Sequence, residues 1–443
     1  MIRSGNCDID TFSIQPFDQG IRSSLAAVSQ WFDDHFCIFM CGKNAGFTKE
    51  EDTLDGWFDS GSTHFASMKK DQGFWPATMY LEGLDQYRGW FQSSLLTAVG
   101  AFGQGAPFKE CVTHGWTVDG EGKAMHKSLG NGVDPADVFN ENGADILRLW
   151  AASADYHADV RCSKEIFKQL SQNYLKFRNT CKFMLDNLVD FDPEKLTKPE
   201  DMPVLDRWLL TKLNELIEKA EQSYCDYEFH IITHAVNDFC VNTLSSFYLD
   251  IVKDRLYCEG AESATRRSAQ TALYLTLHTL SKLFAPILAF TCDEIWLAMP
   301  HTGDDDARNV VLNEMNKPFT AYALDSETMA RWEHIIAVRT VVNGALEEAR
   351  AAKVIGKSLE ADVHLTVPES DRFFADESPE ALADIFIVSK VELAIGDALA
   401  VKVDNAAGTK CPRCWKHSLE ANAEGLCPRC AEVVKHLHLT KLL

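Results

Sequence analysis

A long stretch with helical periodicity, residues 163–300, constrains the fold more than any other feature of this sequence. Apolar residues recur there at steps of three and four, which places them on one face of a helix. The first face comprises Ile166, Leu170, Tyr174, Phe177, Cys181, Met184 and Leu188, and the second comprises Leu205, Leu209, Leu213, Leu216 and Ala220. Two more helical stretches follow, near 234–254 and 266–299. We therefore expect residues 161–310 to form an antiparallel bundle of about four or five helices.

The segment before the bundle, residues 46–160, has a different pattern, rich in glycine and aromatic residues. The apolar stretches ATMYLEG (77–83) and ECVTHGW (110–116) are typical of strands that end in glycine turns. The stretch 88–102 between them predicts a helix. Strands that alternate with helices indicate half of a parallel α/β domain. Residues 1–45 have no sustained period and stay unassigned, with a non-native start as one interpretation.

A small α+β junction module is expected after the bundle, over residues 311–405. Residues 329–361 predict a long helix with Lys and Arg on its outer face. The stretches ADVHLTV (361–367) and DIFIVSKVEL (384–393) alternate as strands do, with Val363, Leu365 and Val367 on one side.

Four cysteines near the end of the chain predict a metal site in residues 406–443. They follow the pattern C-x₂-C-x₁₂-C-x₂-C and are Cys411, Cys414, Cys427 and Cys430. Zinc takes four soft ligands in a tetrahedron, and four protein ligands leave no position for catalysis. We expect one structural zinc ion. Disulfides or free thiols are the alternative, and His417 is a spare ligand or a surface residue.

The fold class that follows is α/β plus all-α: a partial Rossmann-like domain, a helical bundle, an α+β module and a zinc knuckle. The net charge of −22 argues against a general polyanion binder but allows a local basic patch. Residues 401–443 carry seven Lys and Arg against four Asp and Glu, a net +3. Arg413, Lys416 and Arg429 lie among the cysteines, where a rigid basic knob could meet phosphates.

Membrane and targeting signals are missing from the sequence pattern. The longest apolar runs, such as 283–290, are far shorter than the roughly 18 residues that suggest a membrane span. No basic and then apolar leader opens the chain, so we expect a cytoplasmic protein without membrane contact.

A polar cluster in the α/β segment is a candidate ligand site. Glu82, Gly83, Asp85 and Gln86 follow a predicted strand and precede a helix, where ligands bind in open α/β sheets. A glycine there lets the backbone approach a ligand closely. The alternative is a capped turn with a structural pair between Arg88 and a carboxylate. A second loop, LDGWFDSGS, contributes Trp57.

A third loop, GKAMHKSLGN (122–131), is similar to a mobile phosphate-binding loop with part of its chemistry changed. Lys127 and Ser128 stand where such a loop needs them, whereas Ala124 and His126 do not. Near neutral pH an ordinary histidine adds little fixed charge.

Six segments in order resemble bacterial isoleucyl-tRNA synthetases, which are class I aminoacyl-tRNA synthetases. They are LDGWFDSGSTH, YLEGLDQYRGWFQSSL, VTHGWTVDGEGKAMHKSLGN, GADILRLWAAS, SSFYLDIVKDRLY and APILAFTCDEIW. The resemblance runs from about residue 47 to the end and closes with the cysteine knuckle. It implies activation of isoleucine with ATP and Mg²⁺ to an adenylate, and transfer of the acyl group to isoleucine tRNA.

The resemblance also implies roles for single residues. Glu82 matches the glutamate that contacts the adenylate, with Gly83, Asp85 and Gln86 beside it. Trp57 and Trp90 match tryptophans that wall the isoleucine pocket. Ala124, Met125, His126, Lys127 and Ser128 match the KMSKS loop, and Lys127 is its second lysine, which neutralises charge on the pyrophosphate leaving group. The bundle matches the anticodon-binding domain, and the family is usually monomeric.

The sequence departs from the family pattern at three points. It contains no HIGH-type motif and no editing insertion, and the first lysine of the KMSKS loop is replaced by Ala124, although Lys123 stands beside it. We expect a carboxy-terminal part of the enzyme that is inactive alone. The alternatives are a non-catalytic tRNA-binding fragment and a remnant without function.

Overall fold

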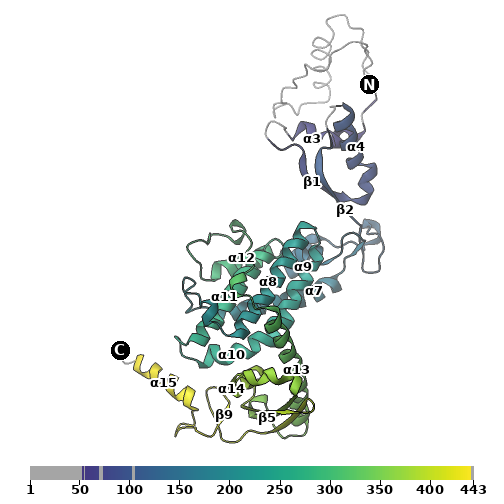
Figure 1. The fold of residues 1–443 in the computed structure, drawn as a ribbon. Coiled ribbons are helices and arrows are strands. Elements are labelled where there is room, and N and C mark those ends of the chain that lie inside the picture. The colour runs from purple at the N-terminus through teal and green to yellow at the C-terminus, as the bar shows by residue number, and fades with distance from the viewer. Residues whose placement is uncertain (1–51, 54, 69–72, 102–104, 441–443) are drawn as a thin grey trace, which may run out of the picture. The chain divides into compact units, whose positions relative to one another are not determined.

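The computed structural model describes residues 52–440 apart from 54, 69–72 and 102–104 (Figure 1). The chain divides into two compact units, one up to Val112 and one from Thr113 onward. The unassigned segment 1–45 lies outside the described residues. Among the described residues, no helix has both the length and the apolar character that a membrane span requires.

The first unit contains a two-stranded sheet and short helices. Strand β1 (Ala77–Gly83) pairs with β2 (Phe108–His114), and α4 (Trp90–Leu96) lies between them in the sequence. The strand predicted at 77–83 is confirmed. The loop predicted around Trp57 is wrong, because this residue lies in helix α2 (Gly56–Gly61). Asp55 caps that helix: its Oδ1 accepts a hydrogen bond of 2.7 Å from Trp57 N.

The second unit begins with a small parallel pair of strands and two helices. Strand β3 (Thr117–Val118) pairs in parallel with β4 (Val160–Arg161). Between them in sequence lie α5 (Pro135–Asn142) and α6 (Ala144–Ser153). This arrangement places the loop 119–131 directly before the two helices.

The predicted helical bundle is present as a set of helices around one large apolar core (Figure 1). Its helices are α7 (Lys164–Asp186), α8 (Val204–Cys225), α9 (Phe229–Asp238), α10 (Leu249–Cys258), α11 (Ala264–Phe284) and α12 (Ala289–Ala298), with a π-helical segment over Phe239–Tyr248. Every residue of the second predicted face is buried, as are the last four of the first face. The stretch predicted at 266–299 is two helices, because Pro286 interrupts it.

The junction module contains helix α13 (Ser326–Ala351) and a three-stranded sheet. The sheet order is β6 (Lys390–Gly396), β5 (Ala361–Pro368), β7 (Ala400–Asn405), with β5 parallel to β6 and antiparallel to β7. Burial alternates along β5, and Val363, Leu365 and Val367 lie on its buried side, as predicted.

Two details of the predicted module are wrong. The strand expected at 384–393 begins only at Lys390, because the residues before it end helix α14 (Pro379–Phe386). Ser378 caps this helix, and its Oγ accepts a hydrogen bond of 3.1 Å from Ala381 N. Arg339 of α13 is not on an outer face: it is 9% exposed, and its Nε donates to the carbonyl of Ile385 at 2.8 Å.

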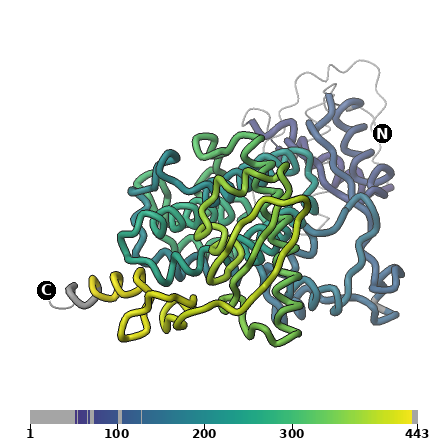
Figure 2. The backbone as a smooth tube through the Cα atoms, turned by 60° about the horizontal axis from the view of Figure 1, so that its bottom comes forward, coloured from purple at the N-terminus to yellow at the C-terminus, as the bar shows by residue number. Residues whose placement is uncertain are grey.

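The tail follows the sheet and ends the described chain. Its strands β8 (Thr409–Lys410) and β9 (His417–Ser418) pair in antiparallel fashion, and helix α15 (Pro428–Thr440) comes last. Figure 2 shows α15 extending from the body of this unit.

Candidate functional site

The predicted ligand cluster of the first unit forms at the end of β1. Glu82 is exposed, and its Oε2 accepts a hydrogen bond of 2.9 Å from Gly83 N. Gln86 connects the cluster to helix α4: its Oε1 accepts from Trp90 N at 2.9 Å, and its Nε2 donates to Asp85 Oδ2 at 3.3 Å. Asp85 and Gln86 are therefore in contact directly after β1, and Glu82 is one of the last two residues of that strand; the binding roles of these residues stay predictions.

The two predicted pocket tryptophans lie close to this cluster. The Trp90 ring stacks on Tyr80 with centroids 4.2 Å apart, and its Nε1 donates to the carbonyl of Ser60 at 3.1 Å. A Cβ atom at Gly89 would lie 3.3 Å from Trp57 Cη2 and 2.5 Å from Gln86 Oε1. Gly89 therefore allows the indole and the amide to approach the same point of the backbone.

The structure does not support the alternative of a turn held by Arg88. Among the described residues, no ion pair joins Arg88 to a carboxylate, and its guanidinium lies over the Tyr87 ring at 5.5 Å. Glu82 and Asp85 are exposed, so both carboxylates remain accessible.

The loop 119–131 of the second unit is braced by Asp119. The Oδ1 atom of Asp119 accepts hydrogen bonds from Glu121 N at 3.0 Å and from Lys123 N at 2.9 Å. Gly122 has φ of 87°, a left-handed conformation that favours glycine in this turn. The N–H of Lys123 and the amide of Asn131 lower the pKa of Asp119.

Asn131 closes the same loop from its other end. Its Nδ2 donates to Asp119 Oδ2 at 2.8 Å and to the carbonyl of Ala124 at 3.1 Å, and its Oδ1 accepts from His126 N at 2.9 Å. Neither Asp119 nor Asn131 is among the residues that the sequence pattern singles out. The DG dipeptide at 119–120 is a turn signal that could have indicated the first of them.

The five residues 124–128, which match the KMSKS loop, have different surroundings. Met125 packs against an apolar cluster formed by Val138, Ile146, Cys162 and Phe167, whereas Ala124, His126 and Ser128 are exposed. The backbone of Lys127 begins a 3₁₀ turn that ends at Leu129. Lys123, the neighbouring cation, forms an exposed ion pair with Glu121 at 2.7 Å. The side chain of Met125 therefore packs against the rest of the unit, whereas the side chains of Ala124 and His126 on either side of it are exposed to solvent.

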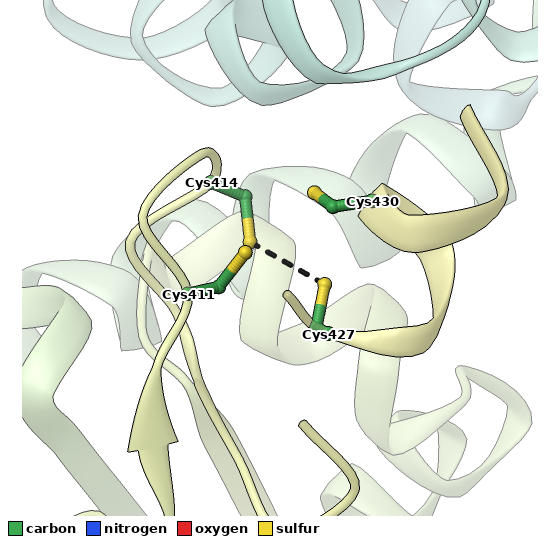
Figure 3. Close-up of side chains that lie close together, drawn as sticks. All are labelled: Cys411, Cys414, Cys427 and Cys430. Atoms are coloured by element: carbon green, nitrogen blue, oxygen red, sulfur yellow. Dashed lines mark hydrogen bonds between the residues drawn. The ribbon is translucent and has the colours of Figure 1, made fainter. Parts of the chain in front are cut away.

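The four predicted metal ligands converge in the tail (Figure 3). The sulfur atoms of Cys411, Cys414, Cys427 and Cys430 lie within 4.8 Å of one another, and none is in a disulfide. Two of them, Cys414 Sγ and Cys427 Sγ, are 3.7 Å apart. Zn–S bonds of about 2.3 Å in a tetrahedron place the sulfurs about 3.8 Å apart, so the set fits one zinc ion.

The backbone around Cys411 favours its thiolate, which is the form that binds metal, whereas burial raises the pKa of Cys414 and of Cys430. Burial alone would raise the pKa of Cys411, but backbone N–H groups, including those of Cys414 and Cys427, outweigh it and lower the pKa to about 6. Hydrogen bonds from surrounding groups to metal ligands orient the ligands and tune the site. His417 is not part of the sulfur cluster, and its backbone N donates to Ser389 Oγ at 2.7 Å.

The predicted basic knob is wrong, because all three cations are engaged inside the unit. Arg413 donates to the carbonyl of Cys258 and, at 3.3 Å, to that of Tyr257. Lys416 pairs with Asp384. Arg429 binds both carboxylate oxygens of Asp254, with Nη2–Oδ1 at 2.9 Å. These contacts fix the tail against helices α10 and α14.

Two family matches define the class of protein in which this site occurs. Residues 12–163 match the class I tRNA synthetases (I, L, M and V), and residues 206–365 match the anticodon-binding domain of tRNA ligases. The chain belongs to the class I tRNA synthetases. The first match begins at residue 12, so it includes much of the segment 1–45, for which the sequence pattern predicts no fold.

Within this class, the chain is similar to isoleucine–tRNA ligases. It is 47% identical over 421 residues to that of Moorella thermoacetica, covering 90% of this chain and 45% of the relative. It is also 47% identical over 398 residues to that of Caldicellulosiruptor saccharolyticus, covering 88% and 43%. The chain thus spans less than half the length of these relatives.

The fold is also similar to that of a solved synthetase. The LeuRS of an Agrobacterium radiobacter LeuRS–tRNA–LeuAMS ternary complex superposes with a TM-score of 0.50 and 15% identity, over 82% of this chain and 38% of that one. At this identity the likeness concerns the fold alone.

Proposed function

We propose that this chain carries part of an isoleucine–tRNA ligase, which activates isoleucine with ATP and transfers it to isoleucine tRNA. The observation that carries the proposal is the 47% identity over 421 residues to an isoleucine–tRNA ligase. The loop 119–131, which Asp119 and Asn131 brace, and the polar residues at the end of β1 support it, because they contain the residues that the proposed reaction requires.

In this proposal the polar cluster binds the activated amino acid. Glu82, Gly83, Asp85 and Gln86 contact the isoleucyl-adenylate, and Trp57 and Trp90 wall the side-chain pocket. The exposed Glu82 and the space beside Gly89, where an added Cβ would lie 3.3 Å from Trp57 Cη2, support these roles. The aromatic walls and the few polar groups are typical of a small-molecule site.

Lys127 neutralises charge on the phosphates of ATP, whose magnesium complex is the substrate. A cation fixed where negative charge develops stabilises the transition state without reorganisation. The hydrogen bonds of Asp119 and Asn131 hold the backbone on either side of Lys127 and support this role. Lys123, which stands beside the replaced first lysine, forms an exposed ion pair with Glu121 at 2.7 Å.

The bundle and the tail bind tRNA in this proposal, with one structural zinc ion in the cysteine cluster. Trp415 supports tRNA binding by the tail: it has φ of 65°, is 56% exposed, and has Lys357 Nζ 5.6 Å from the centre of its ring. An exposed aromatic face beside a cation is a platform on which unpaired bases stack.

Two assays with the purified chain distinguish a catalytic part of the enzyme, a non-catalytic tRNA-binding fragment and a remnant without function. Isoleucine-dependent ATP–pyrophosphate exchange measures activation, and a gel shift with an isoleucine tRNA transcript measures binding. We expect binding without exchange, because the chain spans less than half the length of its relatives. Clear isoleucine-dependent exchange would contradict the expected inactivity, and loss of both signals would favour a remnant without function.

A further inference from the structure

Helix α6 lies next to both the loop 119–131 and the break between helices α11 and α12. Its sequence, ADILRLWAAS, contains two charged residues, Asp145 and Arg148, three positions apart. Residues at this spacing lie on the same side of a helix. Both reach segments more than 130 residues away in the sequence.

Asp145 caps helix α12 from outside. It is 7% exposed, and its carboxylate accepts hydrogen bonds from Phe290 N at 3.3 Å, from Thr291 N at 2.8 Å and from the Thr291 hydroxyl at 2.6 Å. Leu288 at the N-cap position of α12 provides no side-chain cap. A carboxylate at this end of a helix satisfies free N–H groups and opposes the helix dipole favourably.

Arg148 binds the free carbonyl groups at the same break between α11 and α12. Its Nε donates to the carbonyl of Ile287 at 2.9 Å, and its Nη2 donates to the carbonyl of Pro286 at 2.6 Å. The guanidinium therefore binds two successive carbonyls that follow the end of α11.

The two side chains together replace two helical hydrogen bonds. In an uninterrupted helix, the N–H of Phe290 would donate to the carbonyl of Pro286, and that of Thr291 to Ile287. Here Asp145 takes both N–H groups and Arg148 supplies donors to both carbonyls. The bend between α11 and α12 is thus closed by one pair of side chains on α6.

Another part of α6 contacts the apolar cluster that seats the loop. Ile146 is 2% exposed and belongs to the cluster against which Met125 packs. Tyr174 of α7 packs against the same cluster, and its hydroxyl lies 3.0 Å from Thr291 Oγ1. A displacement of the bend therefore either breaks these hydrogen bonds or moves α6 and α7, which contact the apolar cluster beside Met125.

We propose that Asp145 and Arg148 are positioning residues that couple the α11–α12 bend of the bundle to the loop 119–131. Closely packed and hydrogen-bonded groups of this kind carry energetic coupling between sites. This proposal rests on the proposed function only for its ligand: if the bundle binds tRNA, bound tRNA is the ligand that acts on the bend.

Hydrogen exchange of the full 443-residue chain tests the coupling without any ligand. The variant Arg148→Lys keeps the charge but loses the fork that binds two carbonyls, and Thr291→Val removes one bond to Asp145. In these variants we expect exchange to rise by about tenfold in the peptides that cover 286–292 and in those that cover 119–131, because both segments open locally more often. Exchange in β5 should stay unchanged. Arg372→Lys, at an exposed residue of the junction module, is the matched control and should change neither peptide.

A second arm adds an unmodified isoleucine tRNA transcript. We expect tRNA to change exchange in 119–131 of the parent chain, and this response to be lost in Arg148→Lys while binding is kept. A rise at 286–292 alone in the free variants, or an unaltered tRNA response in Arg148→Lys, would overturn the coupling. If the parent chain does not bind tRNA, the proposed function fails, and the ligand-free arm still decides the coupling.

Discussion

At the scale of single residues, the side-chain amide of Asn131 holds the two ends of the loop 119–131 together. Lys127 and Ser128 stand out because they match a known spacing of letters. Asn131 has no such signal: its importance comes from hydrogen bonds to Asp119, Ala124 and His126, which depend on how the loop folds back. Polar residues in turns carry no periodicity, so their partners could not be predicted from the sequence.

The variant Asn131→Ala should loosen the loop without unfolding the protein. It removes three hydrogen bonds, each contributing about 1 kcal/mol in an ordinary setting. Asn131→Asp should loosen it further, because a second carboxylate would then face Asp119 where a donor now lies 2.8 Å away. Hydrogen exchange of peptides covering 119–131 measures both effects.

The matched control for this series is Asn142→Ala, an exposed residue of α5 whose amide makes one long contact of 3.5 Å to Ser171 Oγ. It should leave exchange in the loop unchanged. Equal exchange in Asn131→Ala and the parent chain would show that the brace does not hold the loop.

At the scale of helices and strands, long periodic segments were predicted well and short ones were not. Helix α7 begins where the period begins, at the Ser163 cap, and β5 shows the predicted alternation. The run DIFIV was predicted as strand although Asp384–Phe386 ends helix α14. A short apolar run buried on several sides fits either period, and the left-handed residue Ile387 that ends the helix is not a usual helix terminator.

Removal of metal should release the tail as one element. Because apparent binding free energies of structural zinc sites reach about 10 kcal/mol or more, chelation should unfold 409–430 while the bundle stays folded. One zinc per chain by elemental analysis, and a rise in exchange confined to the tail after chelation, are the expected results. Cys414→Ser should behave like the chelated protein, and Cys225→Ser, at an exposed cysteine, should not.

The Asp305 carboxylate should stabilise the folded bundle, and this contribution to the free energy of unfolding should be lost at acidic pH. Burial raises its pKa, but His278 and Thr302 outweigh this and lower it to about 2 from 3.8. A lowered pKa in the folded state stabilises the protein above pH 3.8, and this contribution is lost as the pH falls toward about 2. The difference corresponds to about 2 kcal/mol for this side chain, which is 6% exposed.

Urea unfolding at a series of pH values checks this contribution. Asp305→Asn should be less stable than the parent at pH 7, with a difference that shrinks between pH 4 and pH 2. Asp186→Asn, at an exposed residue of α7, is the control. A constant difference between Asp305→Asn and the parent across this range would contradict the assignment.

At the scale of the whole molecule, changes in the apolar period along the sequence predict the order of the domains. They do not predict how many apolar residues each domain buries. In the described part of the first unit, the buried apolar residues are few: Tyr80, Phe91 and Ala98. The second unit has a continuous core that runs from the bundle into the junction sheet. Burial depends on contacts far apart in sequence, which composition alone does not define.

The two units should therefore differ in resistance to proteolysis. Local stability follows the amount of buried apolar contact, so cleavage should begin within residues 52–112. Brief digestion followed by mass spectrometry should yield a lasting fragment that begins near Thr113. Simultaneous loss of both units at every protease concentration would mean that they unfold together.

The bend beside Pro286 is a place where a set of backbone groups depends on partners from another helix. Phe290 and Thr291 offer N–H groups, and Pro286 and Ile287 offer carbonyls, whether or not α6 is present. With α6 in place they bind its side chains; without it, Pro286 would still interrupt the helix and these groups would need other partners. The junction between α11 and α12 thus depends on two side chains of a third helix, and substitutions on α6 can alter it without changing a residue of either of the two.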